Sequence, residues 1–191
     1  MGPDDTVATA CLDEFGHLLF LYTIGHDLHV YRFNPESPSV SLQHLVTKTI
    51  TEVKDDPDGA FIVSMEYVQE LEAAVLAFSN GEIYLFDVQA KAVKEAGMVD
   101  GAIIAAKWSP NEEYYAVASD QGKILLFTPE WEVLYEADID DGDLTFADGQ
   151  EVTEDDRYIG QACITWRGDS STFQINYSIN GGFKCLARDV E

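Results

Sequence analysis

The residues with the clearest chemical potential are the carboxylates of one acidic segment. From Glu130 to Asp156 the sequence holds twelve acidic residues and no Lys or Arg. Clustered carboxylates suit Ca²⁺, and an EF-hand loop requires oxygen ligands at positions 1, 3 and 5, Gly at 6 and Glu at 12. A loop that begins at Asp138 has Asp143 at position 6 and Gly149 at position 12, so the motif fails. We expect instead a solvated loop or an acidic contact for a basic partner.

This segment carries half of the net charge of the chain. The 191 residues include 11 Lys+Arg and 35 Asp+Glu, for a net charge of −24. Nucleic acids and anionic lipids are bound through clustered bases, so direct binding to either is excluded, and no run of 18 apolar residues offers a membrane span. The candidate contacts for a basic partner are Asp138, Asp140, Asp141, Asp143, Asp155 and Asp156.

Histidine and cysteine suggest no catalytic or metal site. His26 and His29 are three residues apart in an expected strand, where odd spacings face opposite sides, so they cannot share a metal. His17 and His44 show no partner in the sequence. The three cysteines form no C-x-x-C pair, which is typical of reduced thiols in a cytoplasmic protein. No G-x-S-x-G elbow or Gly-rich phosphate loop occurs. We therefore expect no catalytic residue, no metal and no cofactor.

A repeat of short apolar runs predicts the elements that position these residues. An apolar run, a tight turn and a second apolar run make a β-hairpin. The turns of three such units are Ser79-Asn80-Gly81, Asp120-Gln121-Gly122 and Asn180-Gly181-Gly182, and a fourth unit spans 18–33. Further strands are expected before the hairpins at 61–67, 103–108 and 162–166, and after two of them at 92–98 and 133–139.

The spacing of the repeat predicts the fold class. The equivalent positions Leu28, Ile83, Ile124 and Phe183 lie 55, 41 and 59 residues apart, and about 40–45 residues is the length of a four-stranded propeller blade. The residues by which the first and third spacings exceed the blade length are assigned to the Pro-containing stretch 34–58 and to the acidic loop. The sequence thus predicts an all-β chain of WD40-like β-propeller blades, about four with the last incomplete, as part of a larger propeller. A β-sandwich is the alternative.

One partial propeller is expected over 1–191. Its blades would span 6–58, 59–99, 100–139 and 160–191, with the acidic inter-blade loop at 138–157. The candidate structural positions are Trp108, Trp166, Asp169, Gly81, Gly122 and Gly182. The two tryptophans end equivalent strands, which predicts packing between neighbouring blades, and the Asp can bond backbone N–H groups in its turn. Open blade edges also predict that the isolated chain is poorly soluble or oligomeric.

Three segments of the sequence resemble a known family. They are a blade pattern over 99–119 that includes Trp108-Ser109-Pro110, the run Thr128-Pro129-Glu130-Trp131, and Trp166-Arg167-Gly168-Asp169. In this order they resemble the N-terminal propeller of the large scaffold subunit of the Elongator complex. The likeness covers about 61–190 and is weaker before it. The acidic loop stands where that family carries a longer insertion.

The resemblance implies a non-catalytic scaffold. Elongator modifies C5 of wobble uridines in transfer RNA, and its radical and acetyl-transfer chemistry belongs to a different subunit. The implied partners are other Elongator subunits, and the implied compartment is the cytoplasm, with the nucleus as the alternative. Two other interpretations stay open: an unrelated WD40 adaptor that binds a basic protein through the acidic loop, and a calcium-dependent or hydrolytic propeller.

Overall fold

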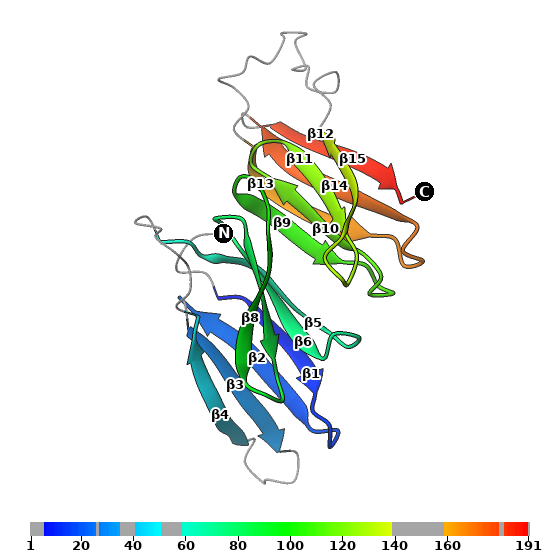
Figure 1. Cartoon of the computed structure of the whole chain (residues 1–191). Coiled ribbons are helices and arrows are strands. Elements are labelled where there is room, and N and C mark those ends of the chain that lie inside the picture. Colours follow the sequence, from blue (N-terminus) through cyan, green and yellow to red (C-terminus); the bar gives the residue numbers. More distant parts are fainter. Residues whose placement is uncertain are drawn as a thin grey trace, which may run out of the picture. The chain divides into compact units, whose positions relative to one another are not determined.

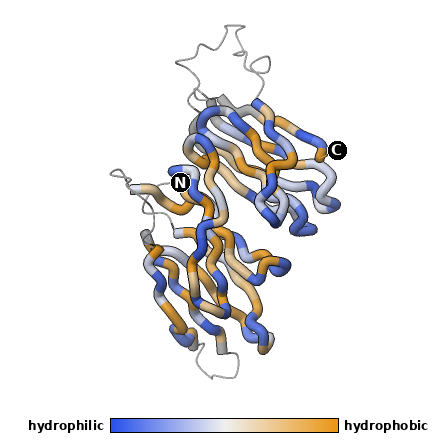
Figure 2. Tube along the Cα trace, in the orientation of Figure 1, coloured by the Kyte–Doolittle hydropathy of each residue, from blue (hydrophilic) through white to orange (hydrophobic). Residues whose placement is uncertain are grey.

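The computed structural model describes residues 6–25, 27–34, 41–50, 59–138, 159–179 and 182–190. Every regular element in these ranges is a β-strand, and the strands form four antiparallel sheets (Figure 1). This confirms the predicted all-β class, with sheets of the size expected for propeller blades. Figure 2 shows apolar residues along the strands and hydrophilic residues at many of the turns.

Each sheet is built from strands that are consecutive in the chain. The first sheet contains β1 (Ala8–Leu12), β2 (Leu18–Ile24), β3 (Asp27–Asn34) and β4 (Ser41–Thr49). The second contains β5 (Ile62–Val68), β6 (Ala73–Phe78), β7 (Glu82–Asp87) and β8 (Ala92–Met98). The third contains β9 (Ile103–Trp108), β10 (Tyr115–Ser119), β11 (Lys123–Phe127) and β12 (Val133–Asp138). The fourth contains β13 (Ile159–Trp166), β14 (Thr172–Ile179) and β15 (Gly182–Asp189).

The chain divides into two compact units, Met1–Met98 and Val99–Glu191. In the first unit the first two sheets share one core, to which β2 contributes Leu19 and Leu21, and β6 contributes Leu76 and Phe78. The contact between these sheets includes a hydrogen bond of 3.4 Å from the Tyr67 amide to the Thr9 hydroxyl. Burial alternates along β2, as expected for a strand covered on one face, whereas every residue of β6 is buried.

The second unit repeats this arrangement with the third and fourth sheets. Their shared core contains Ala116 and Ile124 from the third sheet, and Phe173, Ile175 and Tyr177 from the fourth. The first strands of the two sheets, β9 and β13, are neighbours. Each unit is therefore a pair of sheets that bury one another.

The first sheet has two outer strands, β1 and β4, for which the sequence analysis gave no expected range. The stretch 34–58 was expected to hold excess connecting residues, but Ser41–Thr49 within it is the edge strand β4. Its pairing with β3 shifts register between Val30 and Tyr31. This bulge breaks the alternation of polar and apolar residues by which a strand is recognised.

Candidate functional site

The outer face of the first sheet, opposite the shared core, carries few charged residues. Strand register places one row of outward residues, Ala8, Tyr22, His29 and Thr47, beside a second row, Ala10, Phe20, Tyr31 and His44. Leu12, Ile24 and Leu42 extend the face and are exposed. None of these eleven residues, which we call the outer face, is Lys, Arg, Asp or Glu, in a chain of which 24% is charged. Asp27, which pairs with Ile24, places one carboxylate at the margin of this face.

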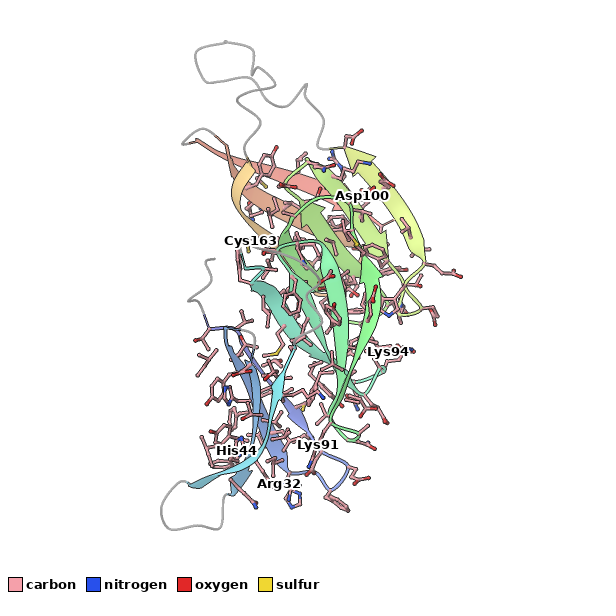
Figure 3. The ribbon with its side chains drawn as sticks, turned by 60° about the vertical axis from the view of Figure 1, so that its left-hand side comes forward. Arg32, His44, Lys91, Lys94, Asp100 and Cys163 are labelled. Atoms are coloured by element: carbon pink, nitrogen blue, oxygen red, sulfur yellow. The ribbon has the colours of Figure 1, made fainter. Side chains whose placement is uncertain are left out.

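Five side chains of the outer face form a closed ring of contacts. Tyr22 stacks on His29 at 5.0 Å between ring centroids and on Tyr31 at 5.7 Å. Tyr31 meets the edge of His44 at 5.1 Å. The Thr47 hydroxyl closes the ring, since its Oγ1 lies 2.9 Å from His44 Nε2 and 3.1 Å from His29 Nδ1. Side chains project from this sheet around the labelled His44 (Figure 3).

The bulge in β4 makes this ring possible. His44 and Thr47 are three residues apart and would face opposite sides of a regular strand. Because Tyr31 pairs with His44 while Val30 pairs with Val46, one residue is inserted between them. The two side chains therefore reach the same face, and His44, which showed no partner in the sequence, has one.

The ring combines two imidazoles, two phenol rings and one hydroxyl on one face of the sheet. The Thr47 hydroxyl has one proton, so at least one of its two imidazole partners donates an N–H to it. No group of three or more His, Cys, Asp or Glu that could hold a metal occurs within the described ranges. A face with stacked aromatic rings and few charges is suited to packing against another protein surface.

The two tryptophans at equivalent strand ends have different surroundings. Trp108 is buried and stacks on Tyr115 at 4.9 Å within its own sheet. Trp166 spans two sheets: its Nε1 donates to the Lys107 carbonyl at 3.1 Å, and its ring stacks on Tyr114 of the third sheet at 6.3 Å. This side chain links the fourth sheet to the third.

The other structural positions, apart from Gly182, lie in turns. Asp169 accepts hydrogen bonds from the Ser171 hydroxyl at 2.7 Å and amide at 3.1 Å, which lower its pKa, and its Oδ2 lies 3.0 Å from Arg167 Nε. Gly81 and Gly122 have φ of 93° and 75°, the left-handed region that a tight turn requires. Gly182 begins β15 opposite Ile179.

Of the acidic residues proposed as partner contacts, one lies in a described range. Asp138 ends β12 and is exposed. Asp140, Asp141, Asp143, Asp155 and Asp156 lie outside the described residues, as does His26. In the described part of the chain, no helix is long and apolar enough to span a membrane.

Four antiparallel sheets of consecutive strands, paired through shared cores, define a chain of β-propeller blades. The sequence model of the ELP1 first N-terminal β-propeller matches residues 5–153. The chain belongs to this family. The match includes the first 60 residues, where the resemblance was expected to be weaker, and ends before Trp166–Asp169, one of the three segments on which the resemblance was based.

Several curated relatives are named Elongator complex protein 1. The Drosophila melanogaster protein is 28% identical over an alignment of 153 positions, which covers 65% of this chain and 12% of the relative. The Arabidopsis thaliana protein is 23% identical over 122 positions, covering 62% of this chain and 9% of the relative. The Schizosaccharomyces pombe protein is 29% identical over 97 positions, covering 48% of this chain and 8% of the relative. The chain thus spans about a tenth of the length of these relatives.

A solved structure shows the same fold. The crystal structure of Chaetomium thermophilum Raptor aligns with 96% of this chain and 15% of its own, with a TM-score of 0.62 and 13% sequence identity. At this identity the likeness concerns the fold alone.

Proposed function

We propose that this chain is a non-catalytic scaffold segment of an Elongator complex that supports wobble-uridine modification of transfer RNA through protein–protein contacts. The observation that carries the proposal is the family match over residues 5–153. The relatives bear the name of an Elongator subunit. We expect the partners to be other Elongator subunits, without direct nucleic-acid or membrane binding, and the compartment to be the cytoplasm.

The outer face supports a scaffold function. A sheet face with few charged residues loses solvent-exposed apolar area when another protein surface covers it, which stabilises the assembly. The opposite face of the same sheet is covered in this way by the second sheet. We therefore propose that the outer face packs against a further blade of the larger propeller or against another subunit.

Co-purification tests the scaffold proposal. The affinity-tagged chain, expressed in cells with an intact Elongator complex, is expected to retain other Elongator subunits, identified by mass spectrometry. A Phe20→Asp, Tyr31→Asp variant introduces two charges into the outer face and is expected to lose the other Elongator subunits. Phe15→Asp, in an exposed turn beside this face, is expected to retain these subunits. A folded parent chain that retains no Elongator subunit would contradict the proposal.

The role in transfer RNA modification has its own test. Loss of the gene is expected to lower the C5-modified fraction of wobble uridines, measured by mass spectrometry of nucleosides. Unchanged modification after loss of the gene, in an organism where the tagged chain does co-purify with the complex, would sink the modification role while leaving membership intact.

A further inference from the structure

The strand β12 is an edge of the third sheet (Figure 1). Within the described residues β11 is its only strand partner. An edge strand directs every second N–H and C=O away from its neighbour, and these groups can pair with another extended chain.

The side chains of β12 are unusually apolar for an exposed edge. Val133, Leu134 and Tyr135 are consecutive and have exposed fractions of 52%, 54% and 39%. Leu134 lies at a register shift, since Tyr135 pairs with Leu126 and Val133 with Phe127. The regular part of the edge is therefore Tyr135–Asp138, with two further apolar side chains at its start.

The charges around β12 are of one sign. Between Glu130 and Asp138 the chain has four carboxylates and no Lys or Arg. On the neighbouring strand, Lys123 Nζ lies 2.5 Å from Glu136 Oε1. The hydrogen bond and charge of Glu136 raise the pKa of Lys123, and the charges of Asp138 and Asp100 raise it further. The potential along this edge is thus negative even where a lysine is present.

This combination selects one kind of occupant. A second copy of the chain would bring like charges together, and like charges directly opposite one another destabilise a strand pair. A basic segment would gain from the same field, which raises association rates and favours its register. Exposed apolar side chains at the edge add contact area for a segment that also carries apolar residues.

We propose that β12 is a docking strand for an extended partner segment in which basic and apolar residues alternate, added as a fifth strand of the third sheet. This interaction goes beyond the proposed scaffold function, because it assigns one strand and one class of ligand. It stands whether or not the chain assembles into Elongator.

Peptide binding to the full chain tests the proposal. The probe is a fluorescein-labelled octapeptide of alternating Lys and Val, and fluorescence anisotropy reports binding. We expect saturable binding that weakens several-fold when salt rises from about 50 to about 500 mM, because exposed charges are screened. N-methylation of every second amide removes hydrogen-bond donors without changing charge and is expected to weaken binding about tenfold.

Charge reversal locates the site. The double variant Glu132→Lys, Asp138→Lys is expected to bind the peptide about tenfold more weakly. Glu14→Lys, Glu95→Lys makes the same change in net charge at exposed positions of the other unit and is expected to bind like the parent. The proposal is overturned if the peptide does not bind, if the N-methylated peptide binds equally well, if an alternating Glu and Val peptide binds equally well, or if both double variants lose affinity alike.

Discussion

Trp166 of the fourth sheet donates its indole N–H to the main-chain carbonyl of Lys107 in the third sheet, at 3.1 Å. In a second hydrogen bond, the main-chain N–H of Asn111, in the turn after β9, donates to the hydroxyl of Ser170, in the turn after β13, at 3.1 Å. Two sheets that share an apolar core are thus also joined by polar bonds, which have direction where the hydrophobic contact has none. These bonds fix how the fourth sheet lies on the third.

Two substitutions of Trp166 separate the contribution of its hydrogen bond from that of its ring packing. Trp166→Phe keeps an aromatic ring against Tyr114 and Phe173 but loses the hydrogen bond, and we expect it to lower the free energy of unfolding by about 1 kcal/mol. Trp166→Ala also loses the ring and is expected to cost about 3 kcal/mol. Urea unfolding followed by circular dichroism measures both. Equal stability of the parent and the Ala variant would show that this link is dispensable.

Gly101 is expected to tolerate no side chain. It has φ of 85°, and a Cβ atom there would lie 2.8 Å from Asp120 Oδ1, which already accepts the Ala102 amide at 2.8 Å. Gly101→Ala is therefore expected to cost about 1–3 kcal/mol. Gly168→Ala is the matched control in the same unit, because a Cβ there meets no heavy atom within 4 Å. Equal melting temperatures for the two variants would contradict this prediction.

Asp13 is expected to make the first unit sensitive to acid. Burial raises the pKa of Asp13, but hydrogen bonds from His17 and the Phe15 amide outweigh it and lower the pKa below its usual value. A carboxyl with a lowered folded-state pKa stabilises the protein above its unfolded pKa of about 3.9, and this contribution is lost as pH falls through the folded pKa.

Asp13→Asn tests this linkage. The variant cannot ionise, and its ion pair with Arg32, 2.9 Å away in the parent, is lost. We expect it to be less stable than the parent by about 1–2 kcal/mol at neutral pH, with the difference narrowing below about pH 4. Urea midpoints measured from neutral to acidic pH give the comparison, with Glu14→Gln as the neighbouring exposed control. A pH-independent difference would argue against the linkage.

The three cysteines are expected to differ in reactivity. Cys11 is buried, and burial, together with the charge of Asp13, raises its pKa to about 11. Cys163 and Cys185 are exposed. Because the thiolate is the nucleophile, a chromogenic disulfide reagent at pH 8 should label the two exposed thiols quickly and Cys11 only after denaturation. If this assignment is correct, Cys11→Ser removes the labelling that appears only after denaturation. A third thiol that still reacts on denaturation of this variant would refute the assignment.

The two exposed cysteines are expected not to form a disulfide with each other. Both pair with Asn176, on opposite sides of β14, so their Cα atoms are two strand spacings apart, about 9.5 Å. A disulfide requires about 4.4–6.8 Å. Mild oxidation should therefore give no internal disulfide, whereas a bismaleimide with a spacer of about 10 Å should link them. An intramolecular disulfide found by peptide mapping would be inconsistent with the register of the fourth sheet.

The outer face is expected to drive self-association of the isolated chain. Covering its aromatic and aliphatic side chains removes apolar surface from water. Phe20→Asp, Tyr31→Asp should increase the monomer fraction in sedimentation velocity, and Phe15→Asp should not. A compact monomer for the parent chain at all concentrations would show that this face needs no cover.

Sequence repetition predicted most of the strands because the hairpins are local. The strand β9 and the outer strand β8 coincide with the expected ranges 103–108 and 92–98, since Asp100-Gly101 separates the two strands and Ser109-Pro110-Asn111 follows β9. The strand β4 was not expected, because a bulge hides its alternation and its face carries polar residues such as His44 and Thr47. The residue inserted between His44 and Val46 breaks the two-residue alternation by which a strand is recognised in a sequence.

The candidate site was less accessible from sequence. The ring through Tyr22, His29, Tyr31, His44 and Thr47 depends on three strands and one register shift, and only the hairpin β2–β3 was predicted. The acidic segment drew attention through charge alone, whereas the exposed apolar residues of β12 became significant once the strand proved to be an edge. The acidic residues can be counted in the sequence, but the exposure of the β12 side chains depends on whether another strand lies beside β12 in the sheet.

The pairing of consecutive strands into consecutive sheets has a consequence for biosynthesis. Every strand pair joins neighbours in the sequence, and each core is completed by two successive sheets. The described residues of the first core all precede Val99, so this core can assemble on the ribosome while the second unit is still being translated. Vectorial synthesis then exposes one uncovered sheet at a time to chaperones and to competing nascent chains.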